Sequence, residues 1–139
     1  MFTADHVAFA NSLRKGTLSE TLGMEFAVDD AGNLRASMPV DERSFQPMRL
    51  LHGGATAALA ETLGSMGSAV LIERSKQGVV GIELGANHLR GVKSGSVTAS
   101  GKLIHKGRTT HVWDISVTND SGELVAVCRI TNLIIDQRP

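Results

Sequence analysis

The residues best suited to chemistry lie in one segment, residues 50–65, which contains a His-Gly-Gly triplet and a single carboxylate. From Leu50 to Ile72, the only ionisable side chains are His52 and Glu61; the others are apolar, small or hydroxylic. The pattern predicts a buried helix that begins at the triplet. A buried carboxylate costs several kcal/mol unless it is paired or its pKa shifts. We therefore expect Glu61 to be a functional residue.

The His-Gly-Gly triplet, residues 52–54, places hydrogen-bond donors at the start of the predicted helix. The first N–H groups of a helix lack intrahelical partners, and together with the helix dipole they favour an anion. Gly53 and Gly54 would let a substrate approach this backbone. The arrangement is typical of an oxyanion hole for an acyl carbonyl. A glycine-rich helix start without a ligand is the alternative interpretation.

Glu61 is a candidate nucleophile or general base. The alternative is a structural carboxylate, either in a buried ion pair or solvated at a gap between subunits. The polar residues that could orient a substrate or a water molecule near it are Gln46 in the preceding loop, His52, and Ser65 one helical turn further on.

The spacing between the two catalytic candidates has a geometric consequence. Gly53 and Glu61 are eight residues apart, which corresponds to roughly 12 Å along one helix. One carbonyl group cannot contact both residues of the same helix. If both are catalytic, the oxyanion donor and the carboxylate must come from two chains, and the sequence then predicts a homodimer with two equivalent shared sites.

Two short basic clusters form a second group of candidates. Residues 87–93 and 105–108 each lie near the end of a predicted strand and combine cations with glycine backbone, a combination that suits phosphates. Solubilising charge at loop tips is the alternative. The sequence shows no spaced His and Cys set for a metal, no Gly-x-Ser-x-Gly motif and no phosphate loop. We expect neither a metal nor a cofactor.

Composition restricts the class of protein. The 139 residues suit one domain, which we expect to span residues 1–139. Fourteen basic and fourteen acidic residues balance, so nothing favours nucleic acid as a partner.

Cys128 is the only cysteine and suits a reducing cytoplasm, where we expect a packed thiol. The N-terminus lacks the pattern of a signal peptide. Glu61, His52 and the glycines favour a core helix over a membrane span for residues 50–72.

The elements that must position these residues follow from periodicity and turn signals. Thr3 is placed to cap a first helix, which Gly16 ends, and a short helix is expected over 18–22. The remaining expectations are strands over 25–29 and 34–40, a long helix over roughly 54–73, and strands over 79–88, 96–105, 109–119 and 123–135.

This order of elements predicts an α+β fold with an antiparallel sheet, because no helices separate the last four strands. One long helix is too little to cover both faces of such a sheet, so we expect the sheet to wrap around it. The helix carries an apolar stripe and a stripe of small or polar residues, through which a backbone or a ligand could approach closely. The small stripe consists of Ala57, Glu61, Gly64, Ser65 and Ser68.

These motifs resemble those of a known family, the hotdog-fold acyl-CoA thioesterases, and in particular the bacterial branch that acts on aromatic acyl-CoAs. The resemblance runs from about residue 18 to 135. The residues that carry it are Gln46-Pro47, Leu51-His52-Gly53-Gly54, Ala60-Glu61, Gly64-Ser65 and Asn87-His88-Leu89-Arg90.

The resemblance implies hydrolysis of a thioester, with a long central helix wrapped by an antiparallel sheet and homodimers that pair into a homotetramer. It assigns the catalytic carboxylate to Glu61 and an oxyanion donor to the Gly53 amide, with Gln46, His52 and Ser65 positioning thioester and water. CoA is then part of the substrate. The residues implied to bind it are Gly81, His88, Leu89, Arg90, His105, Lys106, Gly107 and Arg108.

Two other functions remain as alternatives at this point. A hotdog-fold hydroxyacyl dehydratase would pair a catalytic histidine with an acid, and His52 has no convincing partner pattern. A non-catalytic acyl-CoA-binding module would not need a carboxylate in the helix.

Overall fold

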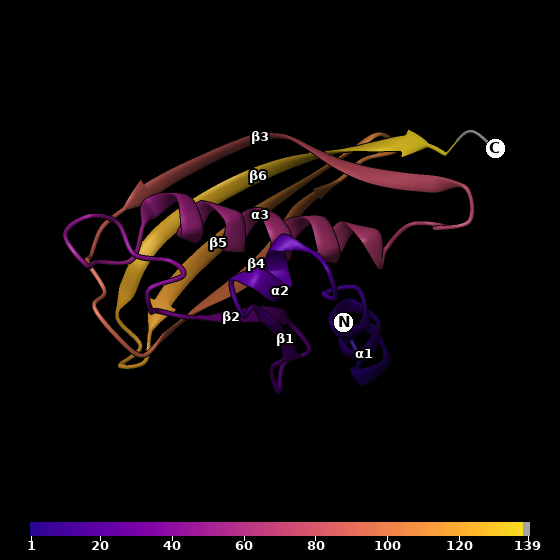
Figure 1. Cartoon of the computed structure of the whole chain (residues 1–139). Helices are drawn as coiled ribbons and strands as arrows, with labels where there is room; N and C mark the ends of the chain where they lie inside the picture. Colours follow the sequence, from indigo (N-terminus) through magenta and orange to yellow (C-terminus); the bar gives the residue numbers. More distant parts are fainter. Residues whose placement is uncertain (138–139) are drawn as a thin grey trace.

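A six-stranded antiparallel sheet curves around one long helix, α3, in a computed structural model that describes residues 1–137 (Figure 1). The helices are α1 (Ala4–Ser12), α2 (Leu18–Thr21) and α3 (Gly53–Ala69). The strands are β1 (Glu25–Val28), β2 (Leu34–Pro39), β3 (Gln77–His88), β4 (Ser96–Lys106), β5 (Thr110–Asn119) and β6 (Leu124–Asp136). The predicted α+β class, with the sheet wrapped around one helix, is confirmed.

The strand order is β1-β2-β4-β5-β6-β3, so β1 and β3 form the edges of the sheet. The inner faces of β4, β5 and β6 carry alternating buried side chains that pack on α3. Strand β3 pairs with β6 along its length, and the register shifts between Gly81 and Glu83. Such a bulge twists a strand locally and changes the direction of its side chains.

Helix α3 lies close to the sheet because small residues face it. A Cβ on Gly64 would overlap the Ile130 side chain, and a Cβ on Gly67 would lie 2.7 Å from the Trp113 ring. Leu59 and Leu63 on the apolar stripe are fully buried. Gly64 of the small stripe and the neighbouring Gly67 therefore accommodate helix–sheet packing.

The observed bounds differ from the predicted ones by a few residues. The long helix ends at Ala69 with Val70 as its C-cap, four residues before the predicted end. Thr3 caps α1 through its side chain, as predicted. Gly16 follows that helix with a left-handed φ of 73°, a conformation that glycine adopts without strain.

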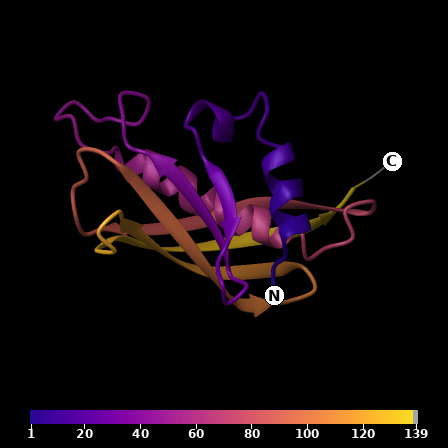
Figure 2. The same cartoon turned by 90° about the horizontal axis from the view of Figure 1, so that it is seen from below.

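The N-terminal helices occupy one side of α3. Viewed from below, α1 stands beside the C-terminal half of α3 (Figure 2). The Arg74 guanidinium carbon lies 3.6 Å above the centre of the Phe9 ring, which ties α1 to the segment after α3. Within residues 1–137, no helix combines the length and the apolar character needed to cross a membrane.

Candidate active site

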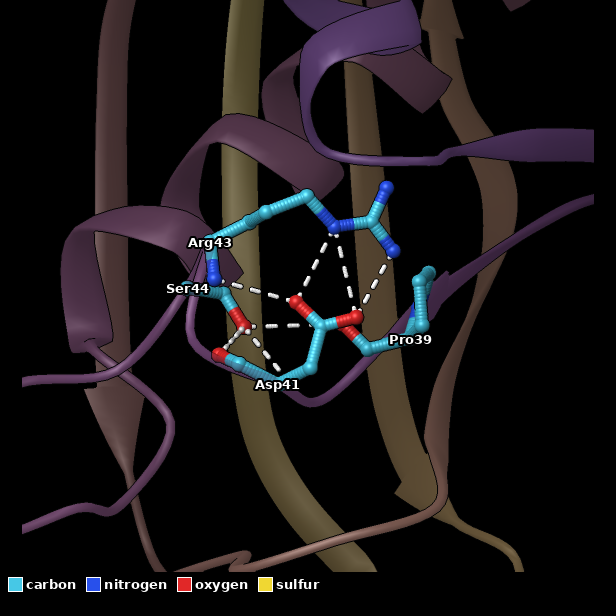
Figure 3. Close-up of polar contacts among 4 residues, drawn as sticks. All are labelled: Pro39, Asp41, Arg43 and Ser44. Atoms are coloured by element: carbon cyan, nitrogen blue, oxygen red, sulfur yellow. Dashed lines mark hydrogen bonds and ion pairs between the residues drawn. The ribbon is translucent and has the colours of Figure 1, made fainter.

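The loop between β2 and α3 carries Gln46 and leads into the helix, and a tight polar turn anchors it (Figure 3). The Asp41 carboxylate accepts hydrogen bonds from the Arg43 side chain, the shortest 2.7 Å long, and from the Arg43 backbone N–H at 3.0 Å. These bonds lower the pKa of Asp41. Ser44 is buried, and its carbonyl accepts from the His52 N–H at 2.7 Å. The turn thus fixes the residue at which α3 begins.

The orientation of the Gln46 amide follows from its neighbours. Its Oε1 accepts a hydrogen bond from the backbone N–H of Met48, and its own N–H donates to the Leu50 carbonyl at 2.8 Å. Because Met48 N–H can pair only with an oxygen, the Gln46 Nε2 points the other way. Gln46 lines a cavity at the start of α3, and its Nε2 has no hydrogen-bond acceptor among residues 1–137.

The first amides of α3 are not equally available. His52 is the N-cap, and its Nδ1 accepts from the Gly54 N–H at 2.7 Å. Neutral His52 consequently carries its proton on Nε2. The His52 N–H is taken by Ser44. Among residues 1–137, the Gly53 N–H has no hydrogen-bond acceptor, so it is the amide left for a ligand.

Gly53 lies directly beneath the imidazole of His88. A Cβ at position 53 would approach His88 Nε2 to 2.9 Å, so a larger residue would displace the imidazole from this position. Gly53, His88 and Gln46 line a cavity of about 390 Å³, together with Leu89 and Arg90. The sequence-predicted oxyanion residue and three predicted substrate contacts are therefore brought together at the N-terminal end of α3.

Glu61 lies on the side of α3 where the sheet ends at β3. The prediction that it is buried is wrong, because its side chain is exposed in the single chain. The carboxylate rests against the backbone of Gly81, where a Cβ would come within 2.5 Å of Glu61 Oε1. Gly81, predicted to contact the CoA arm, lies beside the candidate catalytic carboxylate.

A second cavity, of about 670 Å³, opens beside Glu61. Ser65 also lines it, and most of its other walls are apolar. These walls come from α1, α2, α3, β3 and the segments that join them, and include Phe9, Leu13, Leu18, Met66, Ile72 and Val79. Its size lies within the range of small-molecule sites, which are lined mainly by apolar side chains with a few polar groups.

Asn132 in β6 is a residue that the sequence reasoning missed. It is fully buried, and its Oδ1 lies 3.2 Å from Ser65 Oγ. Its position is an inward-facing one in a strand whose other inward residues are apolar, including Cys128, Ile130 and Ile134. A lone amide in that alternating pattern was the available signal.

The candidate residues fall into two groups within one chain. Gln46 and Gly53 line the cavity at the start of α3, whereas Glu61 and Ser65 line the cavity further along, and the two cavities share no lining residue. Because α3 is continuous from Gly53 to Ala69, the separation of roughly 12 Å between Gly53 and Glu61 applies to the folded chain.

The two basic clusters also lie apart within one chain. Lys106 is opposite His111 on β5, whereas His88 lies, through β6, at the level of Val117. Six residues of extended strand separate these levels by roughly 20 Å. The Gly107 N–H donates to the Thr110 carbonyl at 2.8 Å and closes the turn of the second cluster.

Arg90 is the one cation of these clusters with an ion pair among residues 1–137. Its guanidinium lies 3.3 Å from the Glu123 carboxylate, and both side chains are about half exposed. Arg108 and Lys106 are exposed and have no carboxylate within ion-pair distance in the same range. The second cluster therefore offers the freer positive charge.

Two further titratable groups are buried away from both cavities. Burial lowers the pKa of His111, and the charges of Lys106 and His105 lower it further. Burial raises the pKa of the Cys128 thiol, so the prediction of a packed rather than reactive thiol is supported. No group of three or more metal-ligating side chains occurs in the described part of the chain.

Comparison with known proteins yields a consistent set of relatives. The Thioesterase superfamily profile matches residues 48–126, which include the end of the loop before α3 and all of α3. Proofreading thioesterase EntH of Klebsiella pneumoniae is 43% identical over 129 residues, 93% of each protein. A variant of thioesterase PA1618 from Pseudomonas aeruginosa superimposes with a TM-score of 0.91 at 45% identity over 94% of each chain. Thioesterase HI1161 from Haemophilus influenzae superimposes with a TM-score of 0.88 at 38% identity, over 98% of this chain and 92% of that one.

Proposed function

Because the chain belongs to the thioesterase superfamily and has its hotdog fold, we propose that it hydrolyses acyl-CoA thioesters with aromatic or otherwise bulky acyl groups. The observation that carries this proposal is the position of Glu61, a single carboxylate at a largely apolar cavity of about 670 Å³. An apolar acyl group suits these walls, and the carboxylate is then next to its carbonyl carbon.

The oxyanion of the reaction would be held at the other cavity. The Gly53 N–H is the free amide at the helix start, and Gln46, whose Nε2 has no acceptor among residues 1–137, lines the same cavity; we infer that both donate to the thioester oxygen. Two N–H donors aimed at one point stabilise the charge that develops on a thioester oxygen, and losing one such donor typically costs about 10²–10³ in kcat. His52 supports this arrangement indirectly, because it caps the helix through Gly54.

The separation of these two groups leads to a site shared between chains. We propose that Glu61 of one protomer works with Gly53 of the partner subunit across a two-fold axis. Strand β3 supports this, because it is a twelve-residue edge with Val80 42% and Ile82 56% exposed. Long edge strands with apolar side chains are suited to pairing with another strand. Dimers of this kind would associate further into the homotetramer.

The same symmetry gives a role to both basic clusters. In an antiparallel pairing of two β3 strands, the turn at 105–108 of one chain approaches the His88 end of its partner. Arg90 and Arg108 would then serve one nucleotide from two chains, where cations suit the phosphates of CoA. Gly81, beside Glu61, would line the passage of the pantetheine arm.

The reaction breaks the acyl carbon–sulfur bond and forms an acyl carbon–oxygen bond. Glu61 either takes a proton from the attacking water or attacks the carbonyl carbon itself to form an anhydride that water then opens. In both routes the thiolate of CoA leaves with the electron pair of the broken bond and gains a proton. The products are a free acid and CoA.

A panel of aryl-CoA and alkyl-CoA thioesters with a thiol reagent tests the proposed function. We expect thiol release with a higher kcat/KM for aromatic substrates, and a loss of about 10³-fold or more in the Glu61→Gln variant. No release from any thioester between pH 6 and 9 would contradict the proposal. Equal kcat/KM for short alkyl substrates would contradict the preference for bulky groups.

A further inference from the structure

A buried polar network lies directly behind the cavity at Glu61. Asn132 of β6 is fully buried and reaches across to three positions on α3. Its Nδ2 donates to the Gly64 carbonyl and to Ser68 Oγ, both at 3.0 Å, and its Oδ1 lies 3.2 Å from Ser65 Oγ. Trp113 Nε1 donates to the same Ser68 oxygen at 2.9 Å. A fully buried amide at a helix–sheet contact requires partners for all of its polar atoms.

The orientation of the Asn132 amide is fixed by the groups around it. A backbone carbonyl can only accept a hydrogen bond, so the group that faces Gly64 must be the Nδ2 donor. The flipped amide would place Asn132 Oδ1 against the Gly64 carbonyl oxygen, and neither oxygen can donate a hydrogen bond. Ser68 Oγ accepts from Trp113 and from Asn132, which uses both of its lone pairs and agrees with this orientation.

The fixed amide in turn determines where the hydroxyl proton of Ser65 lies. Asn132 Oδ1 can only accept, so the Ser65 O–H must donate to it. The remaining capacity of Ser65 Oγ is its two lone pairs, and Ser65 lines the cavity one helical turn from Glu61. Ser65 thus presents an acceptor to the cavity and has no proton left for a substrate carbonyl.

We propose that Asn132 is a positioning residue that commits Ser65 to accept a hydrogen bond from the hydrolytic water. This inference rests on the proposed function of the Glu61 site and assigns separate roles to the groups that form it. Gly53 and Gln46 donate to the thioester oxygen, whereas Ser65 accepts one O–H of water. That water directs its oxygen lone pair at the acyl carbon, in the thioester or in an anhydride with Glu61. The proton released from water goes to Glu61 or to the leaving carboxylate.

The test is a double-mutant cycle measured as kcat and KM with an aryl-CoA thioester. Asn132→Leu removes the acceptor for Ser65, and we expect kcat to fall about tenfold with KM changed less than about twofold, because a hydrogen bond used only to orient water is lost. In the Ser65→Ala background, the same substitution should change kcat less than about twofold. Asn132→Asp, as the neutral acid that burial favours, keeps an acceptor oxygen toward Ser65 and an O–H donor toward the Gly64 carbonyl, so it should retain kcat within about threefold.

Ser68→Ala is the matched control, because it removes another partner of the same amide and leaves the Asn132–Ser65 bond in place. We expect a lower Tm with kcat within about twofold of wild type. An equal loss of kcat on adding Asn132→Leu to wild type and to Ser65→Ala would overturn the proposal, as would a rise in KM in place of a fall in kcat. If Asn132→Leu does not fold, folded Asn132→Asp decides, and a loss of kcat above about threefold overturns the proposal. A wild-type protein without thiol release would instead overturn the proposed function, on which the inference rests.

Discussion

Replacing Gly81 by alanine should disable Glu61 without unfolding the protein. The added Cβ would lie 2.5 Å from Glu61 Oε1, whereas ordinary contacts begin at 3.4 Å, so the carboxylate must move by about 0.9 Å. Glu61 is exposed and its side chain is flexible, so the move costs little stability. A misplacement of about 1 Å in a catalytic group costs about 10²-fold in rate. We expect kcat to fall about 100-fold.

Gly85→Ala on the same strand is the matched control, because its new Cβ would meet nothing closer than 3.7 Å. Both variants should unfold at or slightly above the wild-type Tm, since alanine loses less backbone entropy on folding than glycine does. The assay is thiol release under saturating aryl-CoA, with the two melting curves measured in parallel. A folded Gly81→Ala enzyme with wild-type kcat would refute the reasoning, because Glu61 would then not need its present position.

Three further predictions concern packing, CoA and pH. Gly67→Ala places a Cβ 2.7 Å from the Trp113 ring, which is fully buried. The overpacking cost should therefore lie in the upper part of the range of about 1–3 kcal/mol and outweigh the helix-propensity gain of about 1 kcal/mol, so that Tm falls by several degrees. An unchanged or higher Tm would contradict this close packing. Arg108→Ala should raise the KM for acyl-CoA more than Arg90→Ala does, because Glu123 already pairs with Arg90, and kcat should be unchanged in both variants. Equal KM values for both variants and wild type would place the nucleotide elsewhere. Burial lowers the pKa of His111 from 6.5, so as the pH falls through 6.5 the unfolded chain binds the proton first and the free energy of unfolding decreases. The difference between the urea midpoints at pH 7.5 and pH 5.5 should therefore be smaller in His111→Gln than in wild type. The same difference in both proteins would contradict this linkage.

The order of elements was predictable because most boundaries have a local signal. Thr3 caps α1, and the 119–122 turn with Gly122 at a φ of 78° joins β5 to β6. The end of α3 was predicted too late, because Val70 continues the apolar pattern although the chain turns there. Local periodicity cannot distinguish a helix from an apolar turn that packs on the same core.

The candidate site was predictable in its residues but less so in its surroundings. The exposure of Glu61 depends on where the sheet ends. The periodicity of the helix does not show which of its sides lies beyond the edge strand and is left uncovered by the sheet. The partnership of Asn132 with Ser65 joins residues 67 positions apart. The orientation of the Gln46 amide depends on a turn formed only in the folded loop. These contacts are set by tertiary structure, which spacing along the chain does not encode.

The most direct test of the central claim, that each site is shared between two chains, is complementation between inactive variants. Glu61→Ala and Gln46→Ala enzymes are each expected to be nearly inactive and folded, and they are mixed after dissociation and reassociation. A hybrid dimer has one doubly damaged site and one intact site, so random mixing should restore about a quarter of wild-type activity. Verified hybrids that remain inactive would show that Gln46 and Glu61 act within one chain, which would contradict the account.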